Sequence, residues 1–226
     1  MVEIIAMTVE DAKQIEAGGA DRIELVSALS EGGLTPSYGL IEAVVNAVKI
    51  PVNIMVRPHA KGFCYTTDEI NLMKRDIEFA KQLKVNGVVF GVLDEQKNIC
   101  EANLQKLLSV CDGLEVTFSR AIDLINPVNG MKILAKYPQV TTVISSGGTG
   151  FIKDNIEILN KMVAHAKHIR LLIGGGLTLD NVEEIMQAVK HADFHFGSAA
   201  RENSSLFGDI SKARIEKLVH IIRENK

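Results

Sequence analysis

The sequence lacks the features that mark several large classes of protein. It has three cysteines, Cys64, Cys100 and Cys111, with no CxxC spacing, which argues against a disulfide-bonded scaffold and against a zinc ribbon. Lys and Arg number 25 against 28 Asp and Glu, a net charge of −3, so there is no basic excess to neutralise a nucleic-acid backbone. The longest apolar runs, such as Gly87–Leu93, are far shorter than the roughly 20 residues of a membrane helix.

Other absences point the same way. The chain opens on Met1, Val2 and Glu3 without the apolar stretch of a signal peptide. It contains no P-loop motif and no HExxH zinc motif. With 46% hydrophobic and 23% charged residues, the composition is that of a folded domain. We therefore expect a cytoplasmic protein with reduced thiols that binds neither nucleic acid nor a membrane.

Short runs typical of β-strands alternate with helical patterns along the whole chain. Several of these runs are apolar at almost every residue, which is typical of parallel strands covered by helices. Eight such units without a linker predict an α/β fold, a single (β/α)8 TIM-type barrel domain over residues 1–226. The alternative is an open doubly wound sheet, which usually has one glycine fingerprint after its first strand. The expected strands are Val2–Met7, Asp21–Val26, Pro51–Arg57, Gly87–Leu93, Leu114–Ser119, Val140–Ser145, Ile169–Ile173 and Asp193–Phe196.

Polar residues occupy every second position of four expected strands. The apolar positions between them must face the helices, so the polar set faces the barrel interior. Four of its members lie nearest the strand ends where barrel enzymes place their active sites, and we expect them to line one cavity and contact a ligand. These are Glu24, Arg57, Ser119 and His195. The alternative is structural: two buried ion pairs, Glu24 with Arg57, and Arg22 with Glu115.

Glycine-rich segments follow the last three expected strands. Backbone N–H groups there can approach an anion closely, and barrels often hold a phosphate at the last two loops. The alternative is that these glycines serve tight turns with positive φ. The candidate anion-binding residues are Ser146, Gly147, Gly148, Gly174, Gly175, Gly176 and Ser198.

Two loops, Ser27–Gly39 and Pro58–Thr67, exceed the typical connection of about 4–6 residues, and such loops tend to cover a site. The second carries His59 and Cys64, which with His195 are the histidines and cysteines that a barrel could bring to its mouth. A metal site at the mouth is an alternative to a site without metal, and the sequence does not identify the metal ligands.

Several motifs occur in order over nearly the whole chain. They are Gly18–Leu25, Glu31–Ser37, Met55–Pro58, Phe63–Tyr65, Met73–Ile77, Gly87–Gly91, Val116–Phe118, Gly174–Gly176 and Phe194–His195. Together they are specific, and the chain resembles the CutC family. The resemblance implies a TIM-type barrel, a cytoplasmic homo-oligomer (a dimer or tetramer), and a part in copper homeostasis with copper as the bound ion. It also adds Arg120 and Asp123 to Glu24, Arg57 and His195 as matched positions and candidate catalytic residues.

The chain departs from the family pattern at positions that concern copper. The resemblance ties copper binding to cysteines on the first strand and at the end of the second, and these positions are Ala6 and Val26 here. Ser119 stands where family members usually have a histidine, and His59–Gly62 stands where they often have Arg-Gly-Gly. Since Cu(I) prefers soft thiolate and thioether ligands, we expect weak Cu(I) binding or none through the family site.

Three functions stay open from the sequence. The first is a copper-binding protein of copper homeostasis, which rests on resemblance. The second is an enzyme whose reaction the sequence does not name, acting on a small anionic or phosphorylated metabolite; it rests on the polar mouth and the glycine-rich strand ends. The third is an oligomeric scaffold without a site.

Overall fold

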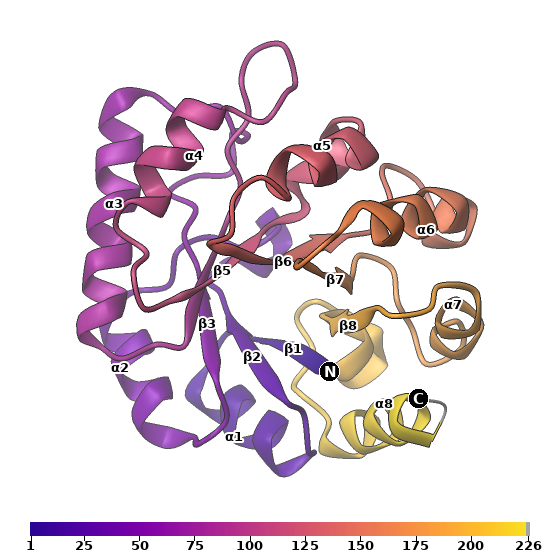
Figure 1. The fold of residues 1–226 in the computed structure, drawn as a ribbon. Helices are drawn as coiled ribbons and strands as arrows, with labels where there is room; N and C mark the ends of the chain where they lie inside the picture. Colours follow the sequence, from indigo (N-terminus) through magenta and orange to yellow (C-terminus); the bar gives the residue numbers. More distant parts are fainter. Residues whose placement is uncertain (225–226) are drawn as a thin grey trace.

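The computed structural model describes residues 1–224, which form a closed barrel of eight parallel strands (Figure 1). Each strand pairs with its neighbours in sequence, and the last pairs with the first. The predicted TIM-type barrel is confirmed, and the doubly wound alternative is wrong. The strands are β1 (Val2–Ala6), β2 (Arg22–Leu25), β3 (Val52–Met55), β4 (Gly87–Phe90), β5 (Glu115–Phe118), β6 (Val140–Ser145), β7 (Arg170–Ile173) and β8 (Asp193–Phe196).

An α-helix follows each strand, and the helices lie outside the barrel (Figure 1). Short 3-10 helices lie in several loops; two of them, η2 (Arg120–Leu124) and η4 (Ser198–Ala200), directly follow the ends of β5 and β8. None of the helices within residues 1–224 has both the length and the apolar character to cross a membrane. The α-helices are α1 (Val9–Ala17), α2 (Tyr38–Ala47), α3 (Thr67–Gln82), α4 (Glu101–Leu108), α5 (Pro127–Leu134), α6 (Ile156–His165), α7 (Val182–Ala188) and α8 (Lys212–Glu224).

Local sequence signals set where the helices begin. Thr66 and Glu69 form a reciprocal capping box at the start of α3, which satisfies backbone N–H groups that the first turn leaves unpaired. Thr8 caps α1 through its side chain. Asn126 caps α5 directly before Pro127, whose missing N–H costs nothing at that position. Each of these three caps defines the residue at which the loop ends and the helix begins.

The alternation along the strands divides the apolar residues into two layers. One large cluster lies between the strands and the helices and includes Ile4 and Ala6 of β1. A second, small cluster lies inside the barrel. Because the side chains of neighbouring strand residues point to opposite faces, the inner cluster alternates with the outer one, and polar residues fill the rest of the interior. The buried members of the inner cluster are Ile5, Val26, Met55, Val89, Ile144 and Leu172.

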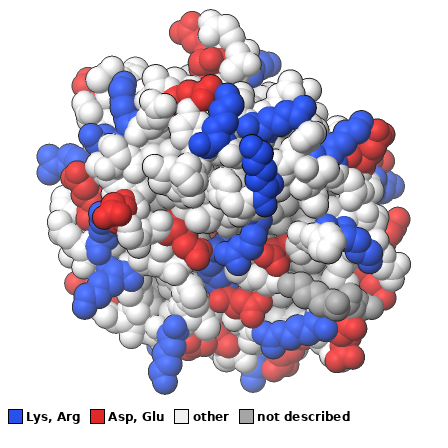
Figure 2. Space-filling view, viewed as in Figure 1, with Lys and Arg blue, Asp and Glu red and all other residues white. Residues whose placement is uncertain are grey.

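On the face drawn in Figure 2, Lys and Arg side chains are interspersed with Asp and Glu side chains. Neither sign of charge forms a continuous field there, which agrees with the nearly balanced charge of the chain. A continuous positive face would be the electrostatic footprint of a nucleic-acid binder.

Candidate functional site

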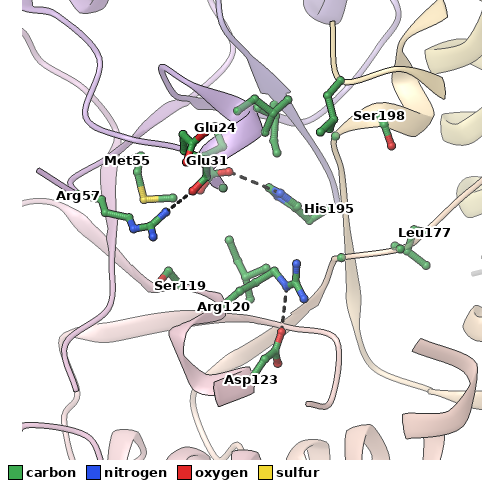
Figure 3. Close-up of a pocket in the computed structure, with 18 of the residues that line it drawn as sticks. Glu24, Glu31, Met55, Arg57, Ser119, Arg120, Asp123, Leu177, His195 and Ser198 are labelled. Carbon is green, nitrogen blue, oxygen red and sulfur yellow. Dashed lines mark hydrogen bonds and ion pairs between the residues drawn. The ribbon is translucent and has the colours of Figure 1, made fainter. Parts of the chain in front are cut away.

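A cavity of about 450 Å³ opens where the strands end at the carboxyl side of the barrel. We call it the mouth cavity. The four residues expected from the alternation all line it, and their side chains converge on one space (Figure 3). The candidate catalytic residues that line it are Glu24, Arg57, Ser119, Arg120, Asp123 and His195. The shared cavity of Glu24, Arg57, Ser119 and His195 is as predicted; the role of all six in binding or catalysis stays a prediction.

Both long loops fold over the mouth cavity, and Arg57 connects them. Its Nη1 donates a hydrogen bond to the backbone oxygen of Glu31 at 2.7 Å, and its guanidinium carbon lies 4.6 Å from the centre of the Phe63 ring. The polar contacts of Arg57 therefore go to loop carbonyls, whereas Glu24 pairs with His195. The predicted alternative of a Glu24–Arg57 ion pair is wrong, because the end of β3 directs Arg57 toward the loops.

Three ionisable side chains form a chain through the barrel interior. Glu3 Oε1 lies 2.8 Å from His195 Nδ1, and Glu24 Oε2 lies 3.5 Å from His195 Nε2. All three are buried. The imidazole thus stands between two carboxyl groups, one on β1 and one on β2; Glu24 and His195 line the mouth cavity, whereas Glu3 lies behind them.

Burial and the neighbouring charges together shift the pKa values of all three groups. Burial raises the pKa of Glu24 to about 7, and the negative charge of Glu3 adds to this rise while His195 opposes it. Burial acts to lower the pKa of His195, but Glu24 and Glu3 outweigh it and the pKa is raised. Burial acts to raise the pKa of Glu3, but Arg22 and His195 outweigh it and the pKa is lowered. A buried carboxyl that titrates near neutral pH is suited to acid–base chemistry.

Below this chain, Arg22 joins two carboxylates. It bonds Glu3 through Nε, and its Nη1 lies 2.8 Å from Glu115 Oε2. The predicted Arg22–Glu115 pair is present. The part played by Glu3 was missed from the sequence, although Glu3 is the one charged residue of the β1 run and shares the inward phase of Ile5.

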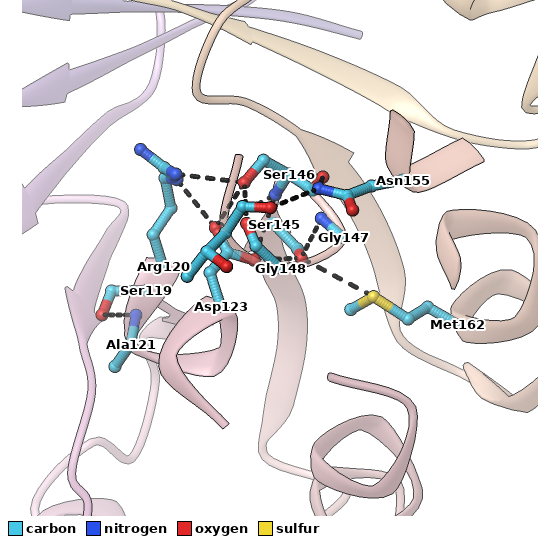
Figure 4. A network of polar contacts seen from close by, with 11 residues as sticks. Ser119, Arg120, Ala121, Asp123, Ser145, Ser146, Gly147, Gly148, Asn155 and Met162 are labelled. Atoms are coloured by element: carbon cyan, nitrogen blue, oxygen red, sulfur yellow. Dashed lines mark hydrogen bonds and ion pairs between the residues drawn. The ribbon is translucent and has the colours of Figure 1, made fainter. Parts of the chain in front are cut away.

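Asp123 anchors the loop after β6 rather than facing a ligand freely (Figure 4). It is buried and accepts hydrogen bonds from the hydroxyl of Ser145 at 2.5 Å and from both the backbone and the hydroxyl of Ser146. Arg120 Nε donates to it at 2.9 Å, and Arg120 Nη2 donates to the Ser146 hydroxyl at 3.0 Å. This network fixes the Arg120 guanidinium at the edge of the mouth cavity.

The structure separates the candidate anion-binding residues into two groups. Ser146, Gly147 and Gly174 have backbone N–H groups that already donate, to Asp123, to the Ser145 hydroxyl and to the Ser145 carbonyl respectively. These three have no backbone N–H left for an anion, because acceptors on Asp123 and on Ser145 at the end of β6 already take them. The other four line the mouth cavity, and within residues 1–224 their N–H groups donate no hydrogen bond. They are Gly148, Gly175, Gly176 and Ser198.

Gly175 lets Arg120 lie against the backbone of the β7 loop. A Cβ at this position would lie 2.3 Å from Arg120 Cζ, and the residue has φ of +90°. The backbone conformation therefore favours glycine, and a larger residue would push the Arg120 guanidinium aside. The alternative explanation of the glycines, tight turns with positive φ, is correct for Gly147, Gly148, Gly175 and Gly176. At Gly175 the missing side chain also lets Arg120 lie next to an unpaired N–H.

Comparison with known proteins identifies the family. The sequence pattern of the CutC family matches residues 1–200. The copper homeostasis protein cutC homolog of Homo sapiens is 36% identical over 208 residues, which is 91% of this chain and 76% of the human protein. The chain belongs to the CutC family. A CutC family protein of Glaesserella parasuis is 37% identical over 95% of this chain and 88% of its own. A CutC crystal structure from Streptococcus agalactiae superposes with a TM-score of 0.81 at 28% identity, covering 86% of this chain and 97% of that one.

The residues at the two copper positions of the family resemblance do not fit Cu(I). Ala6 packs in the outer cluster against the helices, whereas Val26 lies in the inner cluster, so their side chains do not share one layer. The β1 residue in the same cluster as Val26 is Ile5. These three side chains carry no donor atom, and the sulfur nearest to Val26 on the cavity wall belongs to Met55, a thioether.

No other metal cluster replaces it. Within residues 1–224, no group of three His, Cys, Asp or Glu side chains could hold a metal ion. His59 Nε2 lies 2.9 Å from Glu69, and neither His59 nor Cys64 is among the residues that line the mouth cavity. The alternative of a metal site built from His59, Cys64 and His195 at the mouth is therefore wrong, because the loop that carries the first two turns them toward α3 and the β4 loop.

Proposed function

We propose that this CutC-family chain is a cytoplasmic one-domain barrel that binds a small anionic ligand, such as a phosphorylated metabolite, in the mouth cavity, and acts on it as an enzyme. The observation that supports this most is that one cavity is lined by two arginines and by four residues whose backbone N–H groups are unpaired within residues 1–224. A volume of about 450 Å³ suits a small molecule rather than a macromolecule.

Both arginines of the cavity wall have an unpaired donor atom within residues 1–224. Arg120 Nη1 has no acceptor among residues 1–224, and the Arg120 side chain is 49% exposed. Arg57 Nε is buried and likewise has no partner within the described chain. Charged donors form the stronger hydrogen bonds to anionic oxygens, and adjacent backbone N–H groups in turns add fixed dipoles. The unpaired donors thus favour a ligand that carries negative charge.

Ligand-dependent stability tests this proposal. A ligand that binds only the folded state raises the apparent stability, so we expect inorganic phosphate, sulfate and the fitting members of a phosphorylated-metabolite set to raise Tm. Arg120→Gln should remove most of this rise, while Arg75→Gln, an exposed arginine on α3 that does not line the cavity, should keep it. If no anion raises Tm of the unaltered protein, the proposal is wrong.

A part in copper homeostasis is the second candidate, and it is supported by the names of relatives that cover most of the chain. The mouth cavity offers Cu(I) the thioether of Met55 without a thiol among its described lining residues. We therefore propose that any such part does not depend on tight Cu(I) binding in the mouth cavity.

We also propose a homo-oligomer. Tyr38, Leu72 and Phe79 support it, since they are 50%, 48% and 41% exposed on the neighbouring helices α2 and α3. The rings of Tyr38 and Phe79 meet edge to face with centroids 6.3 Å apart. Large apolar side chains gathered in one exposed place are typical of a protein interface.

A further inference from the structure

We propose that Glu24 and His195 are a proton-transfer pair for the ligand of the mouth cavity, with Glu24 as the group that exchanges a proton with that ligand and Glu3 as the residue that positions His195. This inference rests on the proposed function, because it requires a ligand in the mouth cavity. It adds the class of reaction, which is acid–base chemistry on a small anionic compound.

Glu24 presents an oxygen that nothing in the described chain satisfies. Its Oε2 faces His195 Nε2 at 3.5 Å, whereas its Oε1 is buried and has no hydrogen-bond partner within residues 1–224. Glu24 also lines the mouth cavity. An unsatisfied buried acceptor costs free energy, and a donor on a bound ligand would satisfy it. The open oxygen therefore points to the place where a ligand proton would lie.

Glu3 holds the imidazole in the orientation that this chemistry needs. It accepts at His195 Nδ1 over 2.8 Å and is itself fully buried and bonded to Arg22. When one ring nitrogen is held by a carboxylate, the hydrogen bond sets both the tautomer and the ring orientation. Nε2 is thereby left to face Glu24, which makes Glu3 a positioning residue.

The surrounding charges favour one shared proton on the pair. Arg22 from β2 neutralises Glu3 from β1 and is also paired with Glu115 from β5, while Arg120 faces His195 from η2 and opposes its positive charge. With one proton, the pair is neutral overall whether Glu24 or His195 carries it. Adding or removing a proton would leave a net charge in the buried interior, which is costly, so the two groups titrate as a unit.

The reaction step is a proton transfer in which all charges are accounted for. The Glu24 carboxylate takes a proton from a hydroxyl of the ligand or from a C–H beside its carbonyl group. The bond from that atom to hydrogen breaks and an O–H bond forms on Glu24. The electron pair stays on the ligand, as an alkoxide or as an enolate, and the resulting oxyanion faces the arginines of the cavity wall, Arg57 and Arg120. Return of the proton from Glu24, or from His195 through Glu24, completes the step.

Site-resolved NMR titration of the ligand-free protein tests the pair directly. With 13C-labelled Glu and 15N-labelled His, we expect the Glu24 carboxyl to titrate with a pKa of about 7 and the His195 ring to titrate above its ordinary value. Glu24→Gln should lower the His195 pKa by about one to three, as expected for the loss of a neighbouring opposite charge. His195→Gln should raise the pKa of Glu24, because the cation that opposes the rise is removed.

Three further variants sharpen this titration. Glu31→Gln changes another carboxylate of the cavity wall and should leave both titrations in place. Glu3→Gln should lower the His195 pKa, and Glu3→Asp should restore part of it, which a purely structural role of Glu3 would not produce. Circular dichroism checks that each variant is folded. If Glu24 titrates near 4.5 and neither variant of the pair moves the other group, the inference is wrong.

Proton-linked binding of sulfate connects the pair to the ligand. Sulfate has no proton to lose near neutral pH, so any proton taken up on binding belongs to the protein. An anion beside the pair raises the pKa of both groups, and we expect calorimetry in buffers of different ionisation heat to show uptake of up to one proton at pH 7 to 8. Glu24→Gln should abolish this uptake and Glu31→Gln should retain it.

The outcomes separate the two proposals. If sulfate binds with the same heat in every buffer, anion binding stands and the proton-transfer inference is overturned. If sulfate and phosphate do not bind at all, the proposed function fails, and the titrations of Glu24 and His195 still decide whether the proton-sharing pair exists.

Discussion

At the scale of single residues, this barrel interior holds side chains that differ sharply in how well they are satisfied. Asp123 is surrounded by donors, whereas Glu24 has one weak partner and an open oxygen. Both are buried carboxyl groups at the same end of the barrel. The contrast indicates that Asp123 holds the loop after β6, whereas the carboxyl group of Glu24 has the unpaired oxygen that the proposed proton transfer requires.

The titration of the interior should appear in the stability of the protein. Glu24 and His195 both have raised pKa values in the folded state, that of Glu24 about 7, so these two groups bind more protons in the folded protein than in the unfolded chain from about pH 4.5 to above pH 7. Stability then falls as pH rises through this window. We expect urea unfolding to show a loss of about 1–3 kcal/mol from pH 5 to pH 8.

The matched variants give the sign of this effect. Glu24→Gln should flatten the pH dependence, since it removes the coupled carboxyl, and Glu31→Gln should leave it unchanged. A stability that rises from pH 5 to pH 8 in the unaltered protein would contradict the raised pKa values.

Thiols placed at the inner cluster should create the Cu(I) site that this chain lacks. Ile5→Cys combined with Val26→Cys puts two thiols in one cluster near Met55, and soft ligands of this kind bind Cu(I) tightly. Competition against a Cu(I) chelator should show weak or no binding by the unaltered protein and a gain of at least about tenfold, roughly 1.4 kcal/mol, in the double variant.

The control uses the neighbouring position. Ala6→Cys with Val26→Cys should gain much less, because Ala6 faces the helices. Stoichiometric binding at nanomolar or tighter affinity by the unaltered protein, persisting after Cys64→Ser, would reveal a copper site elsewhere.

At the scale of elements, the loops after the strands contribute Arg120 and the unpaired N–H groups of the mouth cavity, whereas the strands contribute Glu24 and His195. The turn after β6 pairs the N–H groups of Ser146 and Gly147 with Asp123 and Ser145. Within residues 1–224, the N–H groups of Gly148, Gly175, Gly176 and Ser198 donate no hydrogen bond. The proposed anion site therefore lies next to Arg120, whereas the proposed proton-sharing pair lies on β2 and β8.

Gly175→Ala should weaken anion binding by displacing Arg120. The added Cβ would meet the guanidinium at 2.3 Å, and φ is +90°. We expect a loss of about 1–3 kcal/mol of stability from backbone strain together with a clear rise in the Kd for sulfate. Gly150→Ala is the matched control, because its φ is +88° and nothing lies within 4 Å of the added atom. It should lose stability by strain and keep its sulfate affinity; equal losses of affinity would show that the Arg120 contact is unimportant.

At the scale of the whole molecule, the fold was predictable because each level of the sequence agrees with it. The apolar runs, the caps of α1 and α3 and the late glycines all indicate the same barrel. The inward phase of Glu24, Ser119 and His195 was also readable, since alternation along a strand fixes which side a residue faces.

The contacts between inward-facing side chains could not be predicted from the pattern of single strands. Which inward residues share a level depends on the stagger between neighbouring strands, and that is set by the closed barrel as a whole. The register places Glu3 beside His195 and Glu24 beside Asn53, which comes four residues before Arg57. Glu24 therefore contacts His195 and not Arg57. The path of the Pro58–Thr67 loop, which takes His59 to Glu69, likewise depends on tertiary contacts and not on local pattern.

Light scattering should show a species larger than one chain of 24.7 kDa. Leu72→Glu places a charge among the exposed apolar side chains of α2 and α3 and should shift the protein toward the monomer, because burying an unpaired charge in an interface is costly. Phe207→Glu, at an 83% exposed position in the loop before α8, should leave the assembly unchanged. A monomer in the unaltered protein would disprove the oligomer, and dissociation by the second variant alone would place the interface at that loop.

The seam between the first and the last strand bears on how the protein is made. Glu3 and His195 are 192 positions apart and meet only where β1 pairs with β8. Because β1 and β2 precede β8 in the chain, Arg22 and both carboxylates leave the ribosome long before the imidazole does. A chain that stops short of Phe196 keeps two open sheet edges, which invite pairing with other chains. Only a chain that includes β8 can pair those edges, and the same closure brings His195 to Glu3 and Glu24.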